Sequence, residues 1–146
     1  TPGRLGMSRI FWDTNVFIYL FEDYGSLAVR ARDLRQAMLE RGDQLVTSAL
    51  TLGEVLVKPL EQGEDELARK YEEAITSTSL MVPFDIKAAR IYAALRCDRS
   101  LRAPDSIQLA CAAAAGVDVF ITHDSRLHSK HVEGIQFIVP LDRAPL

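Results

Sequence analysis

The sequence predicts an α/β protein, a three-layer α/β/α sandwich with a mostly parallel central sheet. Short apolar segments alternate with helical segments along the 146 residues, which is the order expected when crossover helices join parallel strands. The segment Val117–Thr122 is largely apolar, as expected of a strand that is covered on both faces. The length suits one domain with its own hydrophobic core.

The first third of the chain is expected to form one strand and two helices. Arg9–Trp12 is a short apolar strand, and a short helix or tight connection follows over residues 15–21. A second helix is predicted from Ser26, as its N-cap, to about residue 41. Its apolar residues fall on one face, and Gly42 is suited to end it.

The middle of the chain adds a strand and two helices. Residues 44–49 are rich in Leu and Val and predict a strand. The next helix contains Glu54 and is expected to kink or end at Pro59, because proline cannot donate a helical backbone hydrogen bond. Residues 64–76 predict a charged amphipathic helix.

The last third alternates strands and helices again. Residues 80–84 predict a short strand, and Pro83 favours an edge position for it. A helix over 85–96 and a polar loop precede a helix that begins at Pro104 and is ended by Gly116. The remaining strands, separated by a short helical turn, are Val117–Thr122 and Ile135–Val139.

A single domain is predicted over residues 7–146, since no linker, repeat or low-complexity stretch interrupts them. Residues 1–6 precede Met7 and are expected to be an expression remnant. No run approaches the ~20 apolar residues of a membrane span, so no membrane association is expected. Two cysteines are too few for a disulfide framework, which suggests a reducing cytoplasm.

Four acidic residues carry the functional prediction: Asp13, Glu54, Asp105 and Asp124. Each is expected at the end of a strand or the beginning of a helix, and in a parallel sheet these places meet at one edge. Two like charges ~4 Å apart repel by ~4 kcal/mol at an effective dielectric of 20, so the group requires cations or protonation. Carboxylate ligands favour Mg²⁺ or Mn²⁺. Without these four residues the formal charge of −3 would be about +1, so the composition does not exclude a local basic surface.

Each acid also has a purely local explanation. Asp13 could form an Asx turn, and Glu54 could form a capping box with Thr51. Asp105 would interact favourably with the dipole at the start of its helix, and Asp124 could be the N-cap of the following turn. The expected convergence of all four at one sheet edge favours a common site over four separate local roles.

Four short segments, taken in order, resemble the PIN-domain ribonucleases, and most closely the VapC-type toxins of bacterial toxin–antitoxin pairs. They are Ile10–Asn15, Ser48 with Glu54, Pro104–Ala110 and Ile121–Asp124. The likeness extends in order from Ser8 to Leu141. His123 departs from the pattern, because the family more often has Asn before the last Asp.

The resemblance implies a PIN-like fold and a metal-dependent endoribonuclease that uses one or two Mg²⁺ or Mn²⁺ ions. The four acids match the family's catalytic and metal-binding residues, and its polar supporting positions are matched by Asn15, Ser48 and Thr122. Hydrolysis by a metal-activated water would leave 5′-phosphate and 3′-hydroxyl ends. The family also implies a small antitoxin that blocks the acidic site, and a homodimer with residues 16–21 and 50–76 as contact surfaces.

Three arginines before the third acid are predicted to bind RNA phosphates: Arg96, Arg99 and Arg102. A solvated loop is the simpler explanation for any one of them. The three histidines have irregular spacing and no nearby cysteine, so loop positions are favoured over a zinc site: His123, His128 and His131.

Other functions fit parts of the sequence. A receiver domain also gathers acids at a parallel sheet edge, but it needs a strand-end lysine, and the only lysine after Lys87 is Lys130, beyond the last acid. A non-catalytic RNA- or protein-binding module of the same fold would be expected to have lost some of the acids. Within the enzyme class, an RNA-processing nuclease without an antitoxin is the alternative to a toxin.

Overall fold

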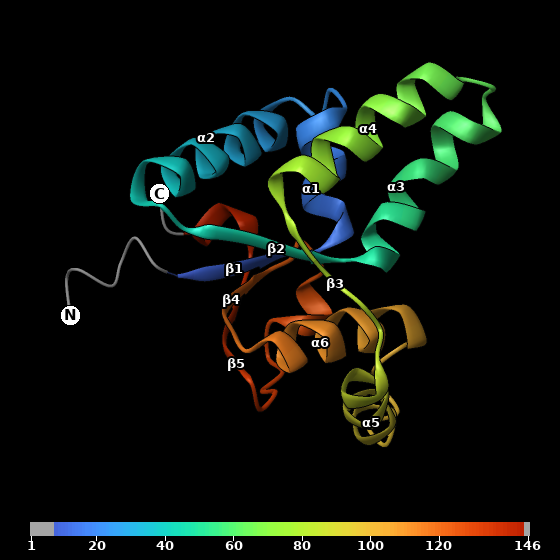
Figure 1. The fold of residues 1–146 in the computed structure, drawn as a ribbon. Helices are drawn as coiled ribbons and strands as arrows, with labels where there is room; N and C mark the ends of the chain where they lie inside the picture. Colours follow the sequence, from blue (N-terminus) through green and yellow to red (C-terminus); the bar gives the residue numbers. More distant parts are fainter. Residues whose placement is uncertain (1–7, 145–146) are drawn as a thin grey trace.

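Five parallel strands form the central sheet of the computed structural model, which describes residues 8–144 (Figure 1). The strands are β1 (Arg9–Trp12), β2 (Gln44–Ser48), β3 (Leu80–Val82), β4 (Val117–Ile121) and β5 (Ile135–Val139). They lie in the order β3-β2-β1-β4-β5, and each neighbouring pair is parallel. The predicted α/β class is therefore confirmed. The expected expression remnant, residues 1–6, lies outside the described residues.

The order of strands reverses at β1. The chain builds β2 and β3 on one side of β1 and then returns to place β4 and β5 on the other side. In open parallel sheets, ligands bind at such a reversal, beyond the carboxyl ends of the strands. Trp12 pairs with Ile121, and the Asp13 N–H donates to the Ile121 carbonyl at 3.0 Å. The residues that follow β1 and β4 are therefore neighbours in space.

Four helices cover one face of the sheet (Figure 1): α1 (Thr14–Phe21), α2 (Ser26–Arg41), α3 (Ala49–Glu61) and α4 (Asp65–Thr78). Ile10 and Trp12 belong to the core beneath them, whereas Phe11 belongs to the core on the opposite face. This alternation follows from the two-residue period of a strand. Trp12 is fully buried and packs against Phe17 with 5.1 Å between ring centroids.

Two helices cover the other face (Figure 1): α5 (Ile86–Leu95) and α6 (Ala103–Ala115). The small buried side chains of α6 let it lie close to the sheet, where Phe11 and Phe120 stack with centroids 4.9 Å apart. Two short 3-10 helices complete the described chain: η2 (Ser125–Leu127) and η3 (Leu141–Arg143). In this described part, none of the helices combines the length and the apolar character needed to cross a bilayer.

Several predicted boundaries are wrong; the strand expected over residues 80–84, for example, ends at Val82. Ser26 is the first residue of α2 rather than its N-cap, because Gly25 precedes it with φ 60°, a conformation that suits glycine. β2 ends at Ser48, whose hydroxyl accepts the Thr51 N–H at 3.4 Å and caps α3. α3 continues to the second residue beyond Pro59, since a proline so close to the helix end removes a single hydrogen bond.

Candidate active site

A pocket of about 490 Å³ is lined by all four acids named from the sequence. They come from four separate segments: the residue after β1, the middle of α3, the first turn of α6 and the residue before η2. Other lining residues include Thr14, Asn15, Arg102 and Gln108. The expected convergence of the acids at one edge of the sheet is therefore present in the structure.

Asp13 is the most enclosed of the four acids, with 7% of its surface exposed. As the N-cap of α1, its Oδ1 accepts the Thr14 N–H at 2.9 Å, and its Oδ2 accepts the Thr122 hydroxyl at 2.8 Å. Gln108 Nε2 also donates to Oδ1, at 3.2 Å. Burial raises the pKa of the Asp13 carboxyl, these three hydrogen bonds offset part of the rise, and the charge of Asp105 adds to it. The local capping role and the place in the pocket coexist.

Glu54 does not form the capping box that the sequence allowed. The N-cap of α3 is Ser48, so Thr51 lies inside the first turn and is not a cap. Glu54 Oε1 instead accepts a hydrogen bond from the Thr14 hydroxyl at 2.6 Å. This bond directs the carboxylate from α3 toward the start of α1, beside Asp13.

Asp105 and Asp124 are both held by arginines. Asp105 Oδ2 lies 3.4 Å from Arg102 Nε and 3.8 Å from Arg126 Nη2. Asp124 is the N-cap of η2, as the sequence allowed, and it accepts the Arg126 N–H at 3.1 Å. The Arg126 guanidinium contacts both oxygens of Asp124, with 2.9 Å from Nε to Oδ1. Hydrogen bonding to Arg126 lowers the pKa of Asp124, and burial opposes part of this change.

Arginine side chains pair with two of the four acids, Asp105 and Asp124, in this conformation. Among residues 8–144, no three carboxylate, imidazole or thiol side chains lie close enough together to share a metal ion. The donor types nevertheless fit Mg²⁺ or Mn²⁺, which take carboxylate oxygens. A cation would also relieve the burial of the Asp13 charge. The chemistry of the donors therefore suits a divalent ion, although the carboxylates of the described residues are not gathered closely enough in this conformation to share one.

Two predicted supporting residues connect the first and last acids. The Thr122 hydroxyl donates to Asp13 and accepts the Asp124 N–H at 3.1 Å. Asn15 Oδ1 accepts the His123 N–H at 3.1 Å, and Asn15 Nδ2 lies 3.4 Å from the Thr122 hydroxyl. These bonds tie the chain after β4 to the start of α1.

Three residues of the site were not singled out from the sequence: Thr14, Gln108 and Arg126. The third predicted supporting residue, Ser48, reaches the acids through Gln108, because its hydroxyl donates to the Gln108 side chain. Gln108 could have been predicted from helical spacing. It follows Asp105 by three residues and therefore lies on the same face of α6.

The arginines predicted to bind RNA are not equally placed. Arg102 lines the pocket, whereas Arg96 and Arg99 lie between α5 and α6, outside its walls. Arg96 Nη1 donates to the Leu101 carbonyl at 3.4 Å. Their role in RNA binding stays a prediction, with Arg102 as the member closest to the acids.

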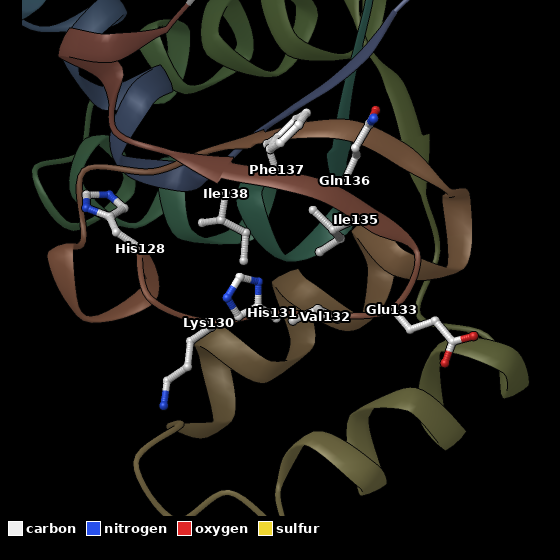
Figure 2. Close-up of a pocket in the computed structure, with 9 residues that line it drawn as sticks. All are labelled: His128, Lys130, His131, Val132, Glu133, Ile135, Gln136, Phe137 and Ile138. Atoms are coloured by element: carbon white, nitrogen blue, oxygen red, sulfur yellow. The ribbon is translucent and has the colours of Figure 1, made fainter.

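The three histidines have different surroundings. The His123 ring meets the Tyr19 ring edge-on, with centroids 5.3 Å apart. His128 Nε2 lies 2.9 Å from the Thr122 carbonyl. His131 and His128 line a second pocket, of about 370 Å³, beside β5 (Figure 2). All three lie in the segments around η2, as the loop interpretation expected.

Solved structures of toxin–antitoxin complexes share this fold. DNA-bound VapBC from Salmonella typhimurium aligns with a TM-score of 0.72 and 18% identity, over 92% of this chain and 99% of that chain. VapBC2 from Rickettsia felis, bound to a promoter DNA fragment, aligns with a TM-score of 0.71 and 14% identity, over 90% of this chain and 98% of that chain. A toxin–antitoxin complex from Klebsiella pneumoniae aligns with a TM-score of 0.64 and 24% identity, over 86% of this chain and 94% of that chain.

Sequence comparison with curated proteins gave no match. A family model described as PIN domain matches residues 10–132, from β1 through the segment after η2. The match includes all four acids of the pocket and every helix from α1 to α6. The family expected from the sequence is therefore confirmed: this chain belongs to the PIN domain family.

Proposed function

We propose that this PIN domain is an endoribonuclease that depends on Mg²⁺ or Mn²⁺. The supporting observation is the single pocket that gathers Asp13, Glu54, Asp105 and Asp124 where the strand order reverses. A bound divalent ion would neutralise the carboxylates and lower the pKa of a coordinated water, which supplies a nucleophile for phosphodiester hydrolysis. Asp13 and Asp105 would hold one or two such ions, with Glu54 and Asp124 as further ligands.

Neighbouring side chains hold these carboxylates in place. Both oxygens of Asp13 are hydrogen-bonded, and the Thr14 hydroxyl holds Glu54. Groups fixed in this way need little rearrangement when charge develops during a reaction. Arg102 and Arg126 place positive charge beside the acids, where it suits the phosphates of a substrate.

The test is cleavage of a mixed RNA panel with Mg²⁺ or Mn²⁺, compared with Asp105→Asn and with an EDTA control. Cleavage by the wild type alone, abolished by EDTA and leaving 5′-phosphate and 3′-hydroxyl ends, is the expected result. Ends with 2′,3′-cyclic phosphate would refute hydrolysis by a metal-activated water. Equal cleavage by Asp105→Asn would refute the assigned site.

We further propose that the protein is the toxin of a toxin–antitoxin pair. The fold shared with VapBC complexes supports this assignment. The antitoxin would be a small protein that covers the acidic pocket with a basic side chain, a mode of binding supported by the pairing of the Arg126 guanidinium with Asp124 and its position 3.8 Å from Asp105. Co-expression with the product of the neighbouring open reading frame should yield a stable complex without nuclease activity. Separate elution of the two proteins would refute the pairing.

A further inference from the structure

A buried glutamine lies among the acids of the pocket. Gln108 has 2% of its surface exposed and follows Asp105 by about one turn of α6. A primary amide brings two donors and an acceptor, and each of them is costly to bury without a partner. A buried glutamine at this position therefore requires hydrogen-bond partners for its amide.

The Gln108 amide contacts several elements at once. Its Oε1 accepts a hydrogen bond from Ser48, at the end of β2. Its Nε2 lies 2.6 Å from the Thr51 hydroxyl, 3.2 Å from the Thr14 hydroxyl and 3.2 Å from Asp13 Oδ1. One side chain of α6 therefore joins the ends of β1 and β2 to the first turns of α1 and α3.

The direction of these hydrogen bonds follows from the chemistry of the partners. An ionised Asp13 only accepts, so the amide nitrogen and not the oxygen must face it. The Thr14 hydroxyl gives its single proton to Glu54, so it accepts from Gln108. The Ser48 hydroxyl accepts a backbone N–H of α3 and uses its own proton on Gln108 Oε1. The amide thus has one consistent orientation, in which its two N–H groups are shared among three acceptors: the Thr51 hydroxyl at 2.6 Å, and the Thr14 hydroxyl and Asp13 Oδ1 at 3.2 Å.

We propose that Gln108 is a positioning residue that sets the spacing between Asp13, Glu54 and Asp105. It holds Asp13 directly and Glu54 through the Thr14 hydroxyl. Asp105 is on the same helix, so α6 cannot shift relative to β1 without breaking the bonds of the amide. The role of this spacing in metal binding and cleavage rests on the proposed function.

The simpler alternative is a core glutamine that affects stability alone, and Thr47 provides the matched comparison. Thr47 is fully buried, and its hydroxyl donates to the Trp12 carbonyl at 2.9 Å and lies 2.8 Å from the Thr51 hydroxyl. Thr47 therefore belongs to the same network of hydroxyls, yet within the described residues its bonds go to these two partners and not to an acid. Thr47→Val removes a buried hydroxyl and leaves the bonds of Gln108 to Asp13 and Thr14 intact.

The first experiment compares the wild type with Gln108→Met, Gln108→His and Thr47→Val. Mn²⁺ binding is followed by the electron paramagnetic resonance signal of the free ion, and RNA cleavage by kcat and KM. Met keeps the length of glutamine without a donor, whereas His keeps a donor at Nε2. We expect Gln108→Met to weaken Mn²⁺ binding about tenfold or more and to lower kcat more than it raises KM. Gln108→His should recover most of the loss.

Thr47→Val should lower the melting temperature but leave the Mn²⁺ affinity close to that of the wild type. Equal weakening of Mn²⁺ binding by Thr47→Val and Gln108→Met would overturn the positioning role, because stability alone would then explain both. Where Gln108→Met does not fold, Gln108→Asn takes its place. Its amide is one methylene too short to reach Asp13, so the same loss is expected.

A second readout needs neither metal nor RNA. The Thr14 N–H donates to Asp13 Oδ1 at 2.9 Å, so its hydrogen exchange reports whether the carboxylate stays in place. Gln108→Met should exchange this proton faster than the wild type, and Thr47→Val should not. If this proton exchanges faster in Gln108→Met but the wild type neither binds Mn²⁺ nor cleaves RNA, the proposed nuclease function is refuted and the positioning role is retained. Unchanged exchange would refute the positioning role even for an active nuclease.

Discussion

At the scale of single residues, Arg126 pairs with Asp124, one of the carboxylates that would bind a divalent ion under the proposed function. Its guanidinium contacts both oxygens of Asp124 and lies 3.8 Å from Asp105. Arg126→Gln removes this charge, so Asp124 loses its arginine partner while Asp105 keeps its contact with Arg102. The arginine side chain is 52% exposed, and exposed pairs are worth ~0–1 kcal/mol. We therefore expect the Kd for Mn²⁺ to fall by up to about fivefold, as measured by isothermal titration calorimetry.

The matched control for that experiment is Arg32→Gln. It removes one positive charge from an exposed position on α2, outside the pocket. The Kd should then stay at the wild-type value. A Kd that is unchanged or higher in Arg126→Gln would show that the arginine does not compete with the ion.

The buried charge of Asp13 should make stability depend on pH. Burial raises the pKa of this carboxyl above its usual 3.8. A carboxyl with a higher pKa in the folded chain binds protons more tightly there, so its ionisation costs stability. This cost is absent below the pKa of the unfolded chain and complete above the pKa of the folded chain. The free energy of unfolding should therefore decline as pH rises through the raised pKa, and Asp13→Asn should lack that decline.

Urea unfolding over the range from about pH 4 to about pH 8 measures this difference. Asp23→Asn is the control, because Asp23 is exposed. Its profile should run parallel to that of the wild type. A parallel profile for Asp13→Asn as well would mean that Asp13 is not destabilised by its burial. Asp13→Asn should also be inactive, which makes it a variant that gains stability at neutral pH while it loses function.

The sequence located the acids better than it located their partners. Asp13 and Asp124 each follow an apolar strand, and the rule for parallel sheets places such residues together. The bond from Thr14 to Glu54 joins residues that are 40 positions apart. No local pattern contains such a contact, because it depends on how α1 and α3 pack on the finished sheet.

At the scale of elements, the turn before β5 depends on Gly134. This residue has φ +97°, and a Cβ atom built there would lie 2.6 Å from the Ala113 carbonyl oxygen of α6. Gly134→Ala therefore adds a collision to a strained backbone, and we expect it to lower the free energy of unfolding by ~2–4 kcal/mol. Chemical denaturation monitored by circular dichroism measures the loss.

Gly116→Ala is the control for the collision. Gly116 has φ +69°, but a Cβ atom there would meet nothing within 4 Å. Backbone strain alone should then cost ~1–2 kcal/mol. Equal losses in the two variants would show that the turn moves away from α6 without penalty.

Element boundaries show what local sequence signals contain. Gly42 and Gly116 end α2 and α6 in the left-handed conformation, as predicted, because that ending depends on one residue. Pro59 was expected to kink or end α3, and the helix does not end there but continues to Glu61. The sequence does not reveal that Pro59 is buried in the fold. Packing of the helix against its neighbours, which local sequence does not describe, determines where such a helix ends.

At the scale of the whole molecule, residues 16–21 and 50–76 are the predicted contact surfaces for a second copy of the chain. Val57 and Leu60 on α3 are 52% and 54% exposed, and both fall in the predicted contact range 50–76. A homodimer should form at micromolar concentration, and Leu60→Asp should shift it to monomer, as measured by light scattering after size exclusion. Leu39→Asp, on an exposed position of α2, should have no effect. A wild type that is monomeric throughout would refute this prediction.

Because β1 pairs with β4, the acidic site is completed late in the synthesis of the chain. Asp13 leaves the ribosome with β1, but Thr122, its hydroxyl partner, lies 109 positions later, next to Asp124. A nascent or truncated chain that stops before β4 lacks both residues and the pairing of β1 with β4. The site of the proposed nuclease therefore cannot be completed until nearly the whole domain has been translated.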